Sequence, residues 1–279
     1  MVTYRDLHTI EDMLACIDLQ MRVWQFDPVD VVPLPILVVT AQYGGFLHGA
    51  FAGNRLVGFV YSFPVRGFQR WLHWSHMLAV DPEYQGRGIG AELKFRQRAF
   101  AQSRGYDLVA WTFDPLETRN AYFNFCKLGV IGRLYKPNIY GQTSSTLHWG
   151  LPTDRLVAEW WVHIQPQQLW PDDPRETADA IIPRPILRRN RPPQPGPIPD
   201  TGWPPMFWVP VPDQAMYPRT RRAQKTYRAR WQQALRTVMT RAFAAGYVAV
   251  HFTRSIPDIG MPGYWLVHSQ HLAKPLPDW

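Results

Sequence analysis

Short runs that contain apolar residues recur along the first 80 positions of the chain, and each has the length of a β-strand. The runs are Val2–Leu7, Gly45–Ala52, Leu56–Phe63 and Leu72–Val80. Runs of this kind that are bounded by Gly or Pro favour strands. Gly53-Asn54 separates the second run from the third and can supply the positive φ of a hairpin turn. We therefore expect a hairpin that ends at Pro64 and one further strand in the same sheet.

Apolar residues spaced three and four apart predict the first helix. They are Ile10, Leu14, Ile17, Met21 and Trp24, and we expect this stripe to be the buried face. Thr9 and Asp12 stand at the spacing of a capping box at the start of the helix. The prolines of Asp27–Pro35 predict a loop after it.

Strand-length apolar runs and helical three-and-four spacing continue to about residue 165. Helices are expected at Glu92–Arg104 and Leu116–Leu128, and strands at Asp107–Phe113, Val130–Tyr135 and Arg155–His163. The element order is therefore β-α-α-β-β-β-α-β-α-β-β. This order predicts an α/β (α+β) fold in which helices flank a mixed sheet.

The composition changes after residue 165. Residues 166–218 hold fifteen of the 27 prolines, which disfavour a helix or a central strand, so we expect a linker or a docking arm there. Trp203, Phe207, Trp208 and Val209 indicate that its later part docks. A helix with a buried stripe at Tyr227, Trp231, Leu235, Val238 and Ala242 is expected at Arg219–Ala245, and two strands after it. We therefore divide the chain into residues 1–165, 166–218 and 219–279.

A glycine-rich turn joins the strand Leu72–Val80 to the helix that begins at Glu92. The turn comprises Gln85, Gly86, Arg87, Gly88, Ile89, Gly90 and Ala91. Its glycines let a ligand approach the backbone, and the amides and dipole of a helix N-terminus bind phosphate without a charged side chain. The glycine spacing is not that of a Rossmann turn, and the Lys-Ser/Thr of a P-loop is absent. A helix start that binds no ligand is the alternative.

Size, charge and cysteine content limit the function further. With 279 residues, 46% of them hydrophobic, the chain can bury a substantial core. Cys16 and Cys126 are too few for a disulfide framework or a zinc site, and we expect no metal. No apolar run reaches about 18 residues and no signal peptide is evident, so we expect a soluble cytoplasmic protein without a membrane span. The net charge of +8 favours anionic partners.

The turn fits the pattern Gln/Arg-x-x-Gly-x-Gly/Ala through Gln85, Gly88 and Gly90, and in this it resembles the pyrophosphate loop of the GNAT N-acyltransferases. Residues 1 to about 165 are similar to that superfamily, and more narrowly to bacterial GNAT proteins with a C-terminal extension. The strings that carry the narrower likeness include Ser75-His76-Met77-Leu78, Thr112-Phe113-Asp114-Pro115-Leu116 and Glu159-Trp160-Trp161. The resemblance implies a sheet that splays where acyl-coenzyme A (acetyl-CoA or succinyl-CoA) enters, and direct transfer of the acyl group to an amine.

The resemblance also implies roles for individual residues. The loop from Gln85 to Ala91 would bind the diphosphate, a backbone N–H near Leu78, Ala79 and Val80 would bind the oxyanion, and Asn120 would contact the pantetheine arm. His76 can titrate near neutral pH, and we expect it on the same side as Leu78 and Val80, as the base that deprotonates the amine. The usual thiolate acid is a Tyr, but Phe125 stands at that position. Tyr122, Tyr140 or Tyr135 could replace it, and transfer without an acid is the alternative, because the thiolate of coenzyme A is a fair leaving group. For each of these residues a purely structural role is the alternative.

Three functions remain open from the sequence. The first is an acyl-CoA-dependent N-acyltransferase that acts on a small-molecule amine or an amino acid. A homodimer is one of the oligomeric states that the sequence leaves open for it. The second, prompted by Phe125, is an acyl-CoA-binding regulatory protein without turnover. The third and weakest is nucleic-acid binding through the basic C-terminal region, where Arg221, Lys225, Arg228 and Arg236 fall on one stripe of a predicted helix.

Overall fold

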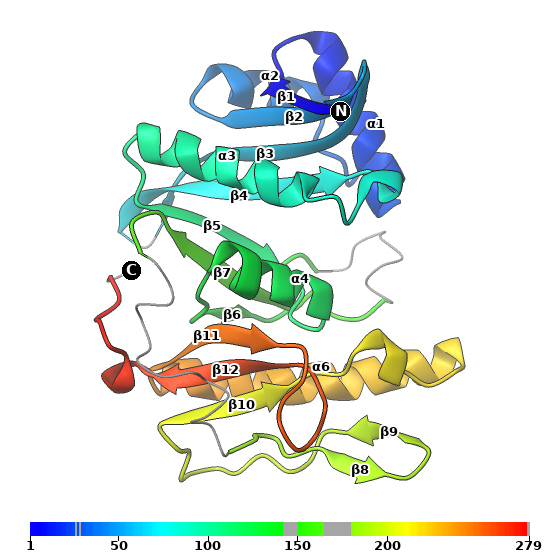
Figure 1. The fold of residues 1–279 in the computed structure, drawn as a ribbon, viewed down its shortest axis with the longest axis vertical. Helices are drawn as coiled ribbons and strands as arrows, with labels where there is room; N and C mark the ends of the chain where they lie inside the picture. Colours follow the sequence, from blue (N-terminus) through cyan, green and yellow to red (C-terminus); the bar gives the residue numbers. More distant parts are fainter. Residues whose placement is uncertain (26, 28, 68, 142–149, 165–179, 278–279) are drawn as a thin grey trace.

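The computed structural model describes residues 1–25, 27, 29–67, 69–141, 150–164 and 180–277. Its larger sheet has seven strands in the order β1-β2-β3-β4-β5-β7-β6 (Figure 1). Their bounds are β1 Val2–Asp6, β2 Phe46–Ala52, β3 Arg55–Gly67, β4 Arg70–Val80, β5 Leu108–Phe113, β6 Tyr135–Lys136 and β7 Arg155–Trp161. All neighbours are antiparallel except β4 and β5. The expected element order and the mixed sheet flanked by helices are confirmed.

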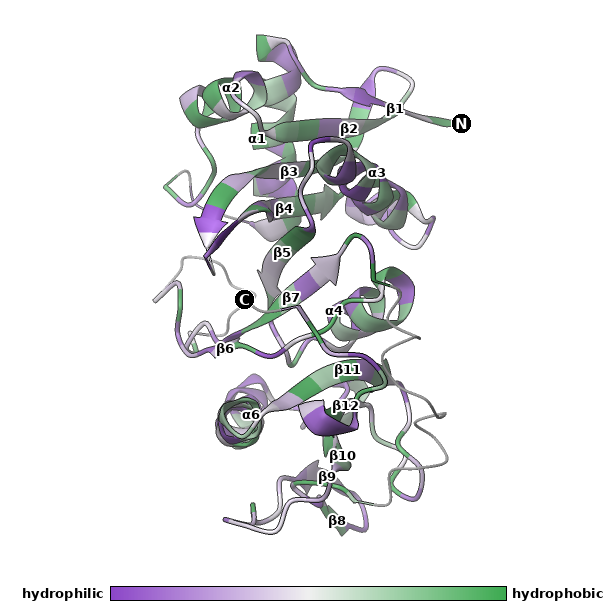
Figure 2. Ribbon diagram, turned by 90° about the vertical axis from the view of Figure 1, so that its left-hand side faces the viewer, coloured by the Kyte–Doolittle hydropathy of each residue, from purple (hydrophilic) through white to green (hydrophobic). Residues whose placement is uncertain are grey.

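Helices cover both faces of this sheet. α1 (Ile10–Trp24) and α2 (Leu34–Gln42) lie on one face, and α3 (Ile89–Ser103) and α4 (Thr118–Tyr122) lie on the other (Figures 1 and 2). A short 3-10 turn, η1 (Pro82–Tyr84), precedes α3, and a π-helical turn, η2 (Phe123–Leu128), continues α4 until Gly129 at φ 75°. The site described below is built between these two layers.

The capping box of α1 is confirmed, but the expected buried face is wrong. Thr9 Oγ1 accepts a hydrogen bond from the Asp12 N–H at 3.2 Å, and the Asp12 carboxylate accepts one from the Thr9 N–H. The buried apolar residues are instead Met13, Cys16 and Leu19, whereas Ile10, Leu14 and Met21 are exposed. Both stripes are apolar at helical spacing, so periodicity alone could not decide which one faces the sheet.

Two strand boundaries also differ from expectation. β3 does not end at Pro64 but continues to Gly67, because its pairing with β2 stops at Ser62 and leaves one edge free, where proline is tolerated. Val130–Tyr135 is not a strand of its own. Ile131 forms a single bridge to Glu159 of β7, and Gly132 forms one to Ala249 of the second sheet, so this segment links the two sheets.

The second sheet contains three antiparallel strands in the order β10-β12-β11. They are β10 (Met206–Pro210), β12 (Gly263–His268) and β11 (Tyr247–Thr253), and α6 (Arg221–Ala244) packs beside them. The expected stripe of α6 is buried throughout. The two-stranded hairpin of β8 (Ile186–Arg188) and β9 (Arg191–Gln194) and two 3-10 turns, η5 (Gln214–Met216) and η6 (Ser269–His271), complete this part.

The proline-rich segment contributes directly to the second sheet. Phe207, Trp208 and Val209 of β10 are at most 1% exposed, which confirms that the later part of the segment docks. β10 is an edge strand of this sheet, and its last residue, Pro210, is compatible with that position. Residues 166–179 of the predicted linker lie outside the described residues. The boundaries at 165 and 218 stay a prediction.

One hydrophobic cluster runs through both sheets. It includes Phe125 and Trp160 from the first part, and Phe207, Trp231 and Tyr264 from the second. The Phe125 and Tyr264 rings lie 5.6 Å apart, and the Tyr264 hydroxyl donates to the Pro115 carbonyl at 2.7 Å. The C-terminal part is therefore packed against the first sheet through a shared core.

Candidate active site

The glycine turn between β4 and α3 is open toward solvent. Gly86 and Gly88 have φ of 77° and 82°, and a Cβ at either position would meet nothing within 4 Å. Gly88 is the N-cap of α3, and no side chain caps the helix. The first helical hydrogen bond runs from the Glu92 N–H to the Gly88 carbonyl, which leaves the N–H groups of Ile89, Gly90 and Ala91 as the free donors of the first turn. Such a terminus suits an anion.

Charged and polar side chains fix the approach to this turn. Asp81 is 3% exposed and caps η1 through its contact with the Glu83 N–H, and Arg55 binds the Asp81 carboxylate at 2.7 Å. Gln85 donates from Nε2 to the Val80 carbonyl at 3.1 Å, and Arg87 donates to the Glu83 carbonyl at 2.9 Å. The turn is therefore held in place while its amides remain accessible.

β4 and β5 separate immediately before this turn. Only His73 with Val109 and Trp74 with Ala110 pair across them, so β4 from Ser75 to Val80 has no partner on that side. On its other side, the Asp81 N–H donates to Val57 of β3. Because antiparallel pairs alternate, the Ala79 N–H also points to β3, whereas the N–H groups of Leu78 and Val80 point into the opening. Ala79 therefore supplies no free donor there.

His76 lies on the opposite face from the one expected. It is the extra residue of a β-bulge, because Tyr61 pairs with Met77 and the next residue of β3, Ser62, pairs with Ser75. Its ring lies 5.7 Å from those of Tyr61 and Phe63, on the α1 and α2 side. Leu78 and Val80 instead approach Gly90 of α3.

The bulge gives His76 an environment that suits a base. The residue is exposed, yet protein atoms crowd its ring and the resulting desolvation lowers the pKa of His76. A lowered pKa keeps the imidazole neutral at pH 7, as proton abstraction requires. The Tyr61 hydroxyl beside it contacts Thr40 Oγ1 of α2 at 2.9 Å. α2 therefore borders the surface on which His76 lies.

A buried lysine lies where the two strands separate, and the sequence analysis did not identify it. Lys94 of α3 is 2% exposed, and its Nζ donates to Ser75 Oγ at 3.0 Å and to Gln97 Oε1 at 2.7 Å. The Nζ lies 3.4 Å from the ring centroid of Trp111 on β5. Burial lowers the pKa of Lys94 well below its usual value. The side chain thus joins β4 to β5 at the apex of the opening.

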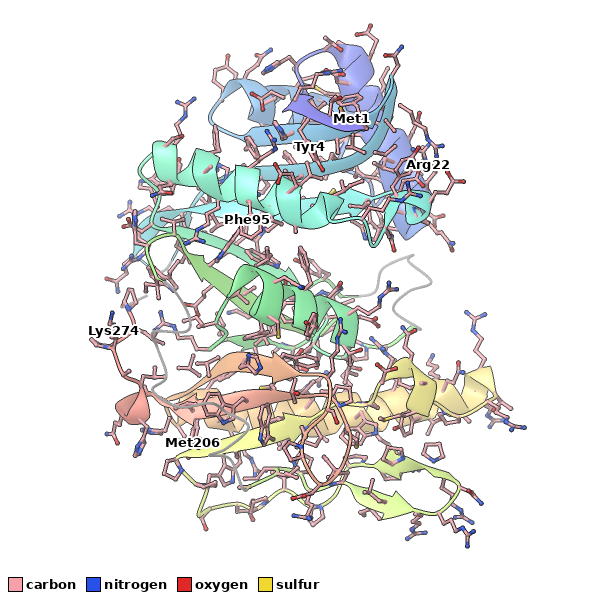
Figure 3. The ribbon with its side chains drawn as sticks, in the orientation of Figure 1. Met1, Tyr4, Arg22, Phe95, Met206 and Lys274 are labelled. Carbon is pink, nitrogen blue, oxygen red and sulfur yellow. The ribbon has the colours of Figure 1, made fainter. Side chains whose placement is uncertain are left out.

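Lys94 shares this layer with aromatic rings. The ring of Phe95, whose position on α3 is labelled in Figure 3, lies 5.7 Å from that of Trp160 on β7. A lysine in an amphipathic helix normally indicates a solvated face, and only its position over Ser75 and Trp111, both distant in sequence, reveals the burial.

The predicted tyrosines lie in different places. Tyr140 is 46% exposed, and its hydroxyl contacts Thr112 Oγ1 at 2.7 Å. Thr112 is two residues beyond Ala110, which pairs with Trp74, so it shares the face of Phe63, next to His76. Tyr140 and His76 therefore lie on one face, on either side of the opening.

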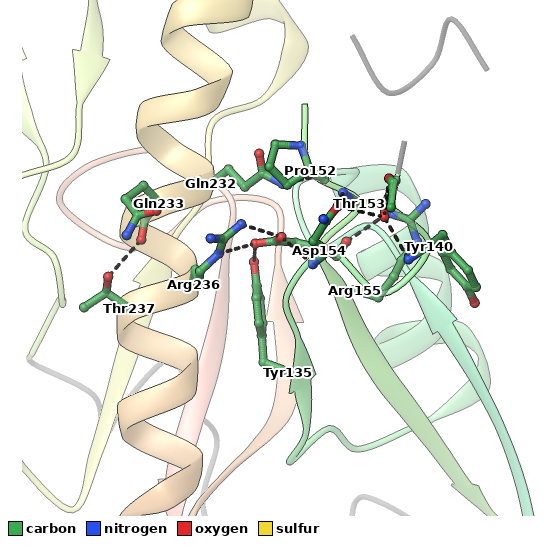
Figure 4. A network of polar contacts seen from close by, with 12 residues as sticks. Tyr135, Tyr140, Pro152, Thr153, Asp154, Arg155, Gln232, Gln233, Arg236 and Thr237 are labelled. Carbon is green, nitrogen blue, oxygen red and sulfur yellow. Dashed lines mark hydrogen bonds and ion pairs between the residues drawn. The ribbon is translucent and has the colours of Figure 1, made fainter. Parts of the chain in front are cut away.

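The remaining predicted residues, on α4, η2 and β6, are not gathered at this opening. Tyr122 lies under Arg254 of the C-terminal part, 3.8 Å from its guanidinium carbon to the ring centroid. Phe125 is buried between Phe113 and Tyr264. Asn120 is exposed, and Tyr135 donates to Asp154 in the contact with α6 (Figure 4). Of the candidate thiolate acids, Tyr140 is the one placed on the same face as His76.

Two classes of site are not found in the part of the chain that the structure describes. No group of three or more His, Cys, Asp or Glu side chains there could hold a metal ion. None of the described helices is long and apolar enough to cross a bilayer.

Residues 13–128 match the acetyltransferase (GNAT) family. No curated protein matches the chain significantly.

Similar solved structures include three acetyltransferases. The ribosomal-protein-S18-alanine N-acetyltransferase of Escherichia coli is 16% identical over 61% of this chain and 99% of its own, with a TM-score of 0.47. An aminoglycoside 6'-acetyltransferase type Ii is 19% identical over 58% of this chain and 99% of its own, with a TM-score of 0.45. The PaiA N-acetyltransferase of Thermoplasma acidophilum, in complex with coenzyme A, is 16% identical over the same shares, with a TM-score of 0.41. Likenesses of this degree carry no information on the acceptor.

Proposed function

Residues 13–128 match the acetyltransferase (GNAT) family, and from this match we propose that the protein transfers an acyl group from acyl-coenzyme A to the amine of a small molecule or an amino acid. The observation that carries the proposal is the uncapped N-terminus of α3, which lies directly after the β4 segment that diverges from β5. A diphosphate at the helix start would place a flexible thioester arm along that opening.

The residues that would hold acyl-coenzyme A follow from this geometry. The turn from Gln85 to Ala91 would bind the diphosphate through its backbone N–H groups. Leu78 and Val80 would pair with the pantetheine amides through the N–H groups that point into the opening, and Ala79 would line it. Asn120 is exposed on α4 and available for a hydrogen bond to the same arm. The acyl group is acetyl, succinyl or one of similar size.

The chemistry of the chain's own groups fits direct transfer. The acceptor amine must lose a proton before it attacks the thioester carbonyl, and neutral His76 can accept that proton directly or through a water. The N–H of Leu78 or Val80 can donate to the oxyanion that forms. Tyr140 can protonate the departing thiolate, whereas Tyr122 would first have to leave its contact with Arg254.

A thermal-shift experiment tests coenzyme binding. Acetyl-CoA or succinyl-CoA at one hundred times Kd should raise the melting temperature by roughly 5 °C. Gly88→Glu should abolish this shift, because a side chain at φ 82° strains the turn and a carboxylate repels the diphosphate. Gly105→Glu is the matched control, since Gly105 has φ 77°, open space around its Cβ direction and a place at the other end of α3. A shift that survives Gly88→Glu would refute this assignment of the loop.

A regulatory protein that binds acyl-CoA without turnover is the second candidate. It is favoured by Phe125, which has no proton to donate and is buried against Phe113 and Tyr264. Release of free thiol when the protein, an acyl-CoA and a panel of amines are mixed distinguishes an enzyme from such a binder. The basic stripe of α6 gives nucleic acid little support, because Arg228 and Arg236 bind Asp114 and Asp154 within the chain.

A further inference from the structure

The hairpin of β8 and β9 combines exposed apolar side chains with a cluster of arginines. Ile186 and Leu187 of β8 are 44% and 54% exposed. At the turn of the hairpin, Arg188, Arg189 and Arg191 are all exposed. The hairpin lies at the end of the molecule farthest from β1 (Figure 1). Arginines protect an edge strand from pairing with other chains, but that role does not require the exposed apolar pair beside them.

The charge of this part of the protein is strongly one-sided. Residues 180–241 contain twelve basic side chains and two acidic ones, Asp200 and Asp213. Asp200 binds Arg241, and Asp213 caps η5. The three arginines at the turn of the hairpin contact no carboxylate of a described residue. A surface of one sign attracts partners of the opposite sign, so we expect an anionic partner here.

The first half of α6 extends this basic surface. Arg222 and Arg230 of α6 line one hollow together with Pro192 of β9. Arg230 Nη1 donates to Gln194 Oε1 at 3.3 Å, which holds the hairpin against the helix. Both arginines are exposed, and neither contacts a carboxylate of a described residue. The hairpin turn and the start of α6 project to the same side of the molecule (Figure 1).

We infer that this end of the protein docks on a lipid bilayer whose headgroups are anionic. The docking surface consists of Ile186, Leu187, Arg188, Arg189, Arg191 and Arg222. The arginines would contact the lipid phosphates, while the apolar pair would enter the boundary between headgroups and acyl chains. A nucleic acid would satisfy the arginines alone, because none of these six residues has an aromatic ring on which a base could stack. The inference concerns the C-terminal part and does not depend on the proposed acyl transfer.

Sedimentation of the full-length protein with lipid vesicles tests the inference. Vesicles of phosphatidylcholine with about one third phosphatidylglycerol should bind the protein at about 0.1 M salt, and binding should weaken as salt is added. Vesicles of phosphatidylcholine alone should bind it at least about tenfold more weakly. Equal binding to the two kinds of vesicle, or binding to neither, would overturn the inference.

Two double substitutions separate the surface from net charge. Arg188→Gln with Arg189→Gln should lower the partition coefficient about 30-fold, since each cation near an anionic surface contributes a factor of about five. Arg66→Gln with Arg104→Gln is the matched control, because both arginines are exposed and lie in the first part of the chain. The control should lower the partition coefficient less than about threefold. Equal losses in the two variants would show that the hairpin has no special role.

A substitution of the apolar pair distinguishes a bilayer from a nucleic acid. Leu187→Ser should lower the partition coefficient about fivefold, because it removes apolar area that the bilayer would bury. Leu14→Ser, at a residue of α1 that is 47% exposed, should leave it unchanged. An unaltered melting temperature shows that each variant is folded. If the protein binds a single-stranded oligonucleotide more tightly than the anionic vesicles, and Leu187→Ser affects neither, the partner is a nucleic acid and the inference is wrong.

Discussion

At the scale of single residues, Lys94 and His76 have environments that no neighbouring residue in the sequence determines. Lys94 is an ordinary position of a helical pattern, yet it is buried over Trp111, and its Nζ donates to the neutral side chains of Ser75 and Gln97. Regular alternation along the strand would place His76 on the same face as Leu78 and Val80, yet a β-bulge turns it to the face covered by α1 and α2. The environment of each residue therefore has a consequence for how stability or activity depends on pH.

Lys94 should make the stability of the protein depend on alkaline pH. Its folded pKa is lowered, so between that pKa and the usual 10.5 the unfolded chain binds a proton that the folded chain does not. The free energy of unfolding should then rise with pH between the folded pKa and 10.5, by at most about 1.4 kcal/mol per pH unit. Lys94→Met should remove this slope and raise stability near pH 7. Urea unfolding of both proteins at pH 7 to 10 measures the difference, and identical slopes would contradict the prediction.

His76 should set the acidic limb of the pH–rate profile. As the proposed base, His76 would act as neutral imidazole, and its lowered pKa means that kcat/KM should fall only below pH 6.5. His76→Gln should lower kcat about 100-fold or more and remove this limb, with the acyl-CoA thermal shift retained. A full-activity His76→Gln variant would assign the proton to another group.

At the scale of elements, one of the ion pairs between α6 and the first part of the chain joins Arg236 to the buried Asp154. Asp154 is 1% exposed and accepts from Arg236 at 2.7 and 2.8 Å and from the Tyr135 hydroxyl at 2.8 Å (Figure 4). Gln232 of the same helix donates to the Pro152 carbonyl at 2.6 Å. These contacts fix the register of α6 against β6 and β7.

Breaking this ion pair should cost more than breaking an exposed one on the same helix. Arg236→Met leaves the buried Asp154 carboxylate without its cation and should lower the free energy of unfolding by about 2 kcal/mol, a value reduced because Arg236 is itself 29% exposed. Arg241→Met should cost under about 1 kcal/mol, since its partner Asp200 is 89% exposed. Urea unfolding of the two variants side by side decides the point, and equal losses would be evidence against it.

At the scale of the whole molecule, the two sheets share one core. Phe125 and Trp160 belong to the same hydrophobic cluster as Trp231 and Tyr264, and Gly132 pairs with Ala249 between the sheets. Removal of the C-terminal part would expose this apolar surface. The part that contains the first sheet and the C-terminal part are therefore expected to be stable only together.

This shared core predicts one cooperative unfolding transition. Hydrogen exchange of β7 and of β10 should lose protection at the same urea concentration, and residues 1–164 expressed alone should aggregate. Earlier opening of residues 206–268, with residues 1–164 remaining folded, would show two independent units and would favour the boundary at residue 165.

The sequence alone determined the features that depend on local patterns. These are the order of elements, the capping box of Thr9 and Asp12, the buried stripe of α6 and the glycine turn at Gly86 and Gly88. Helical period, strand alternation and backbone freedom act over a few residues, so neighbouring positions contain the information.

The tertiary structure decided everything that depends on residues distant in the chain. It selected Met13 and Leu19 over Leu14 as the buried side of α1 and left the apolar face of α2 exposed. It turned His76 away from Leu78 through a mismatch in pairing with β3, and it buried Lys94 between β4 and β5. These outcomes follow from which surfaces meet in space, because an apolar stripe or a lysine has the same local pattern whether or not another element covers it.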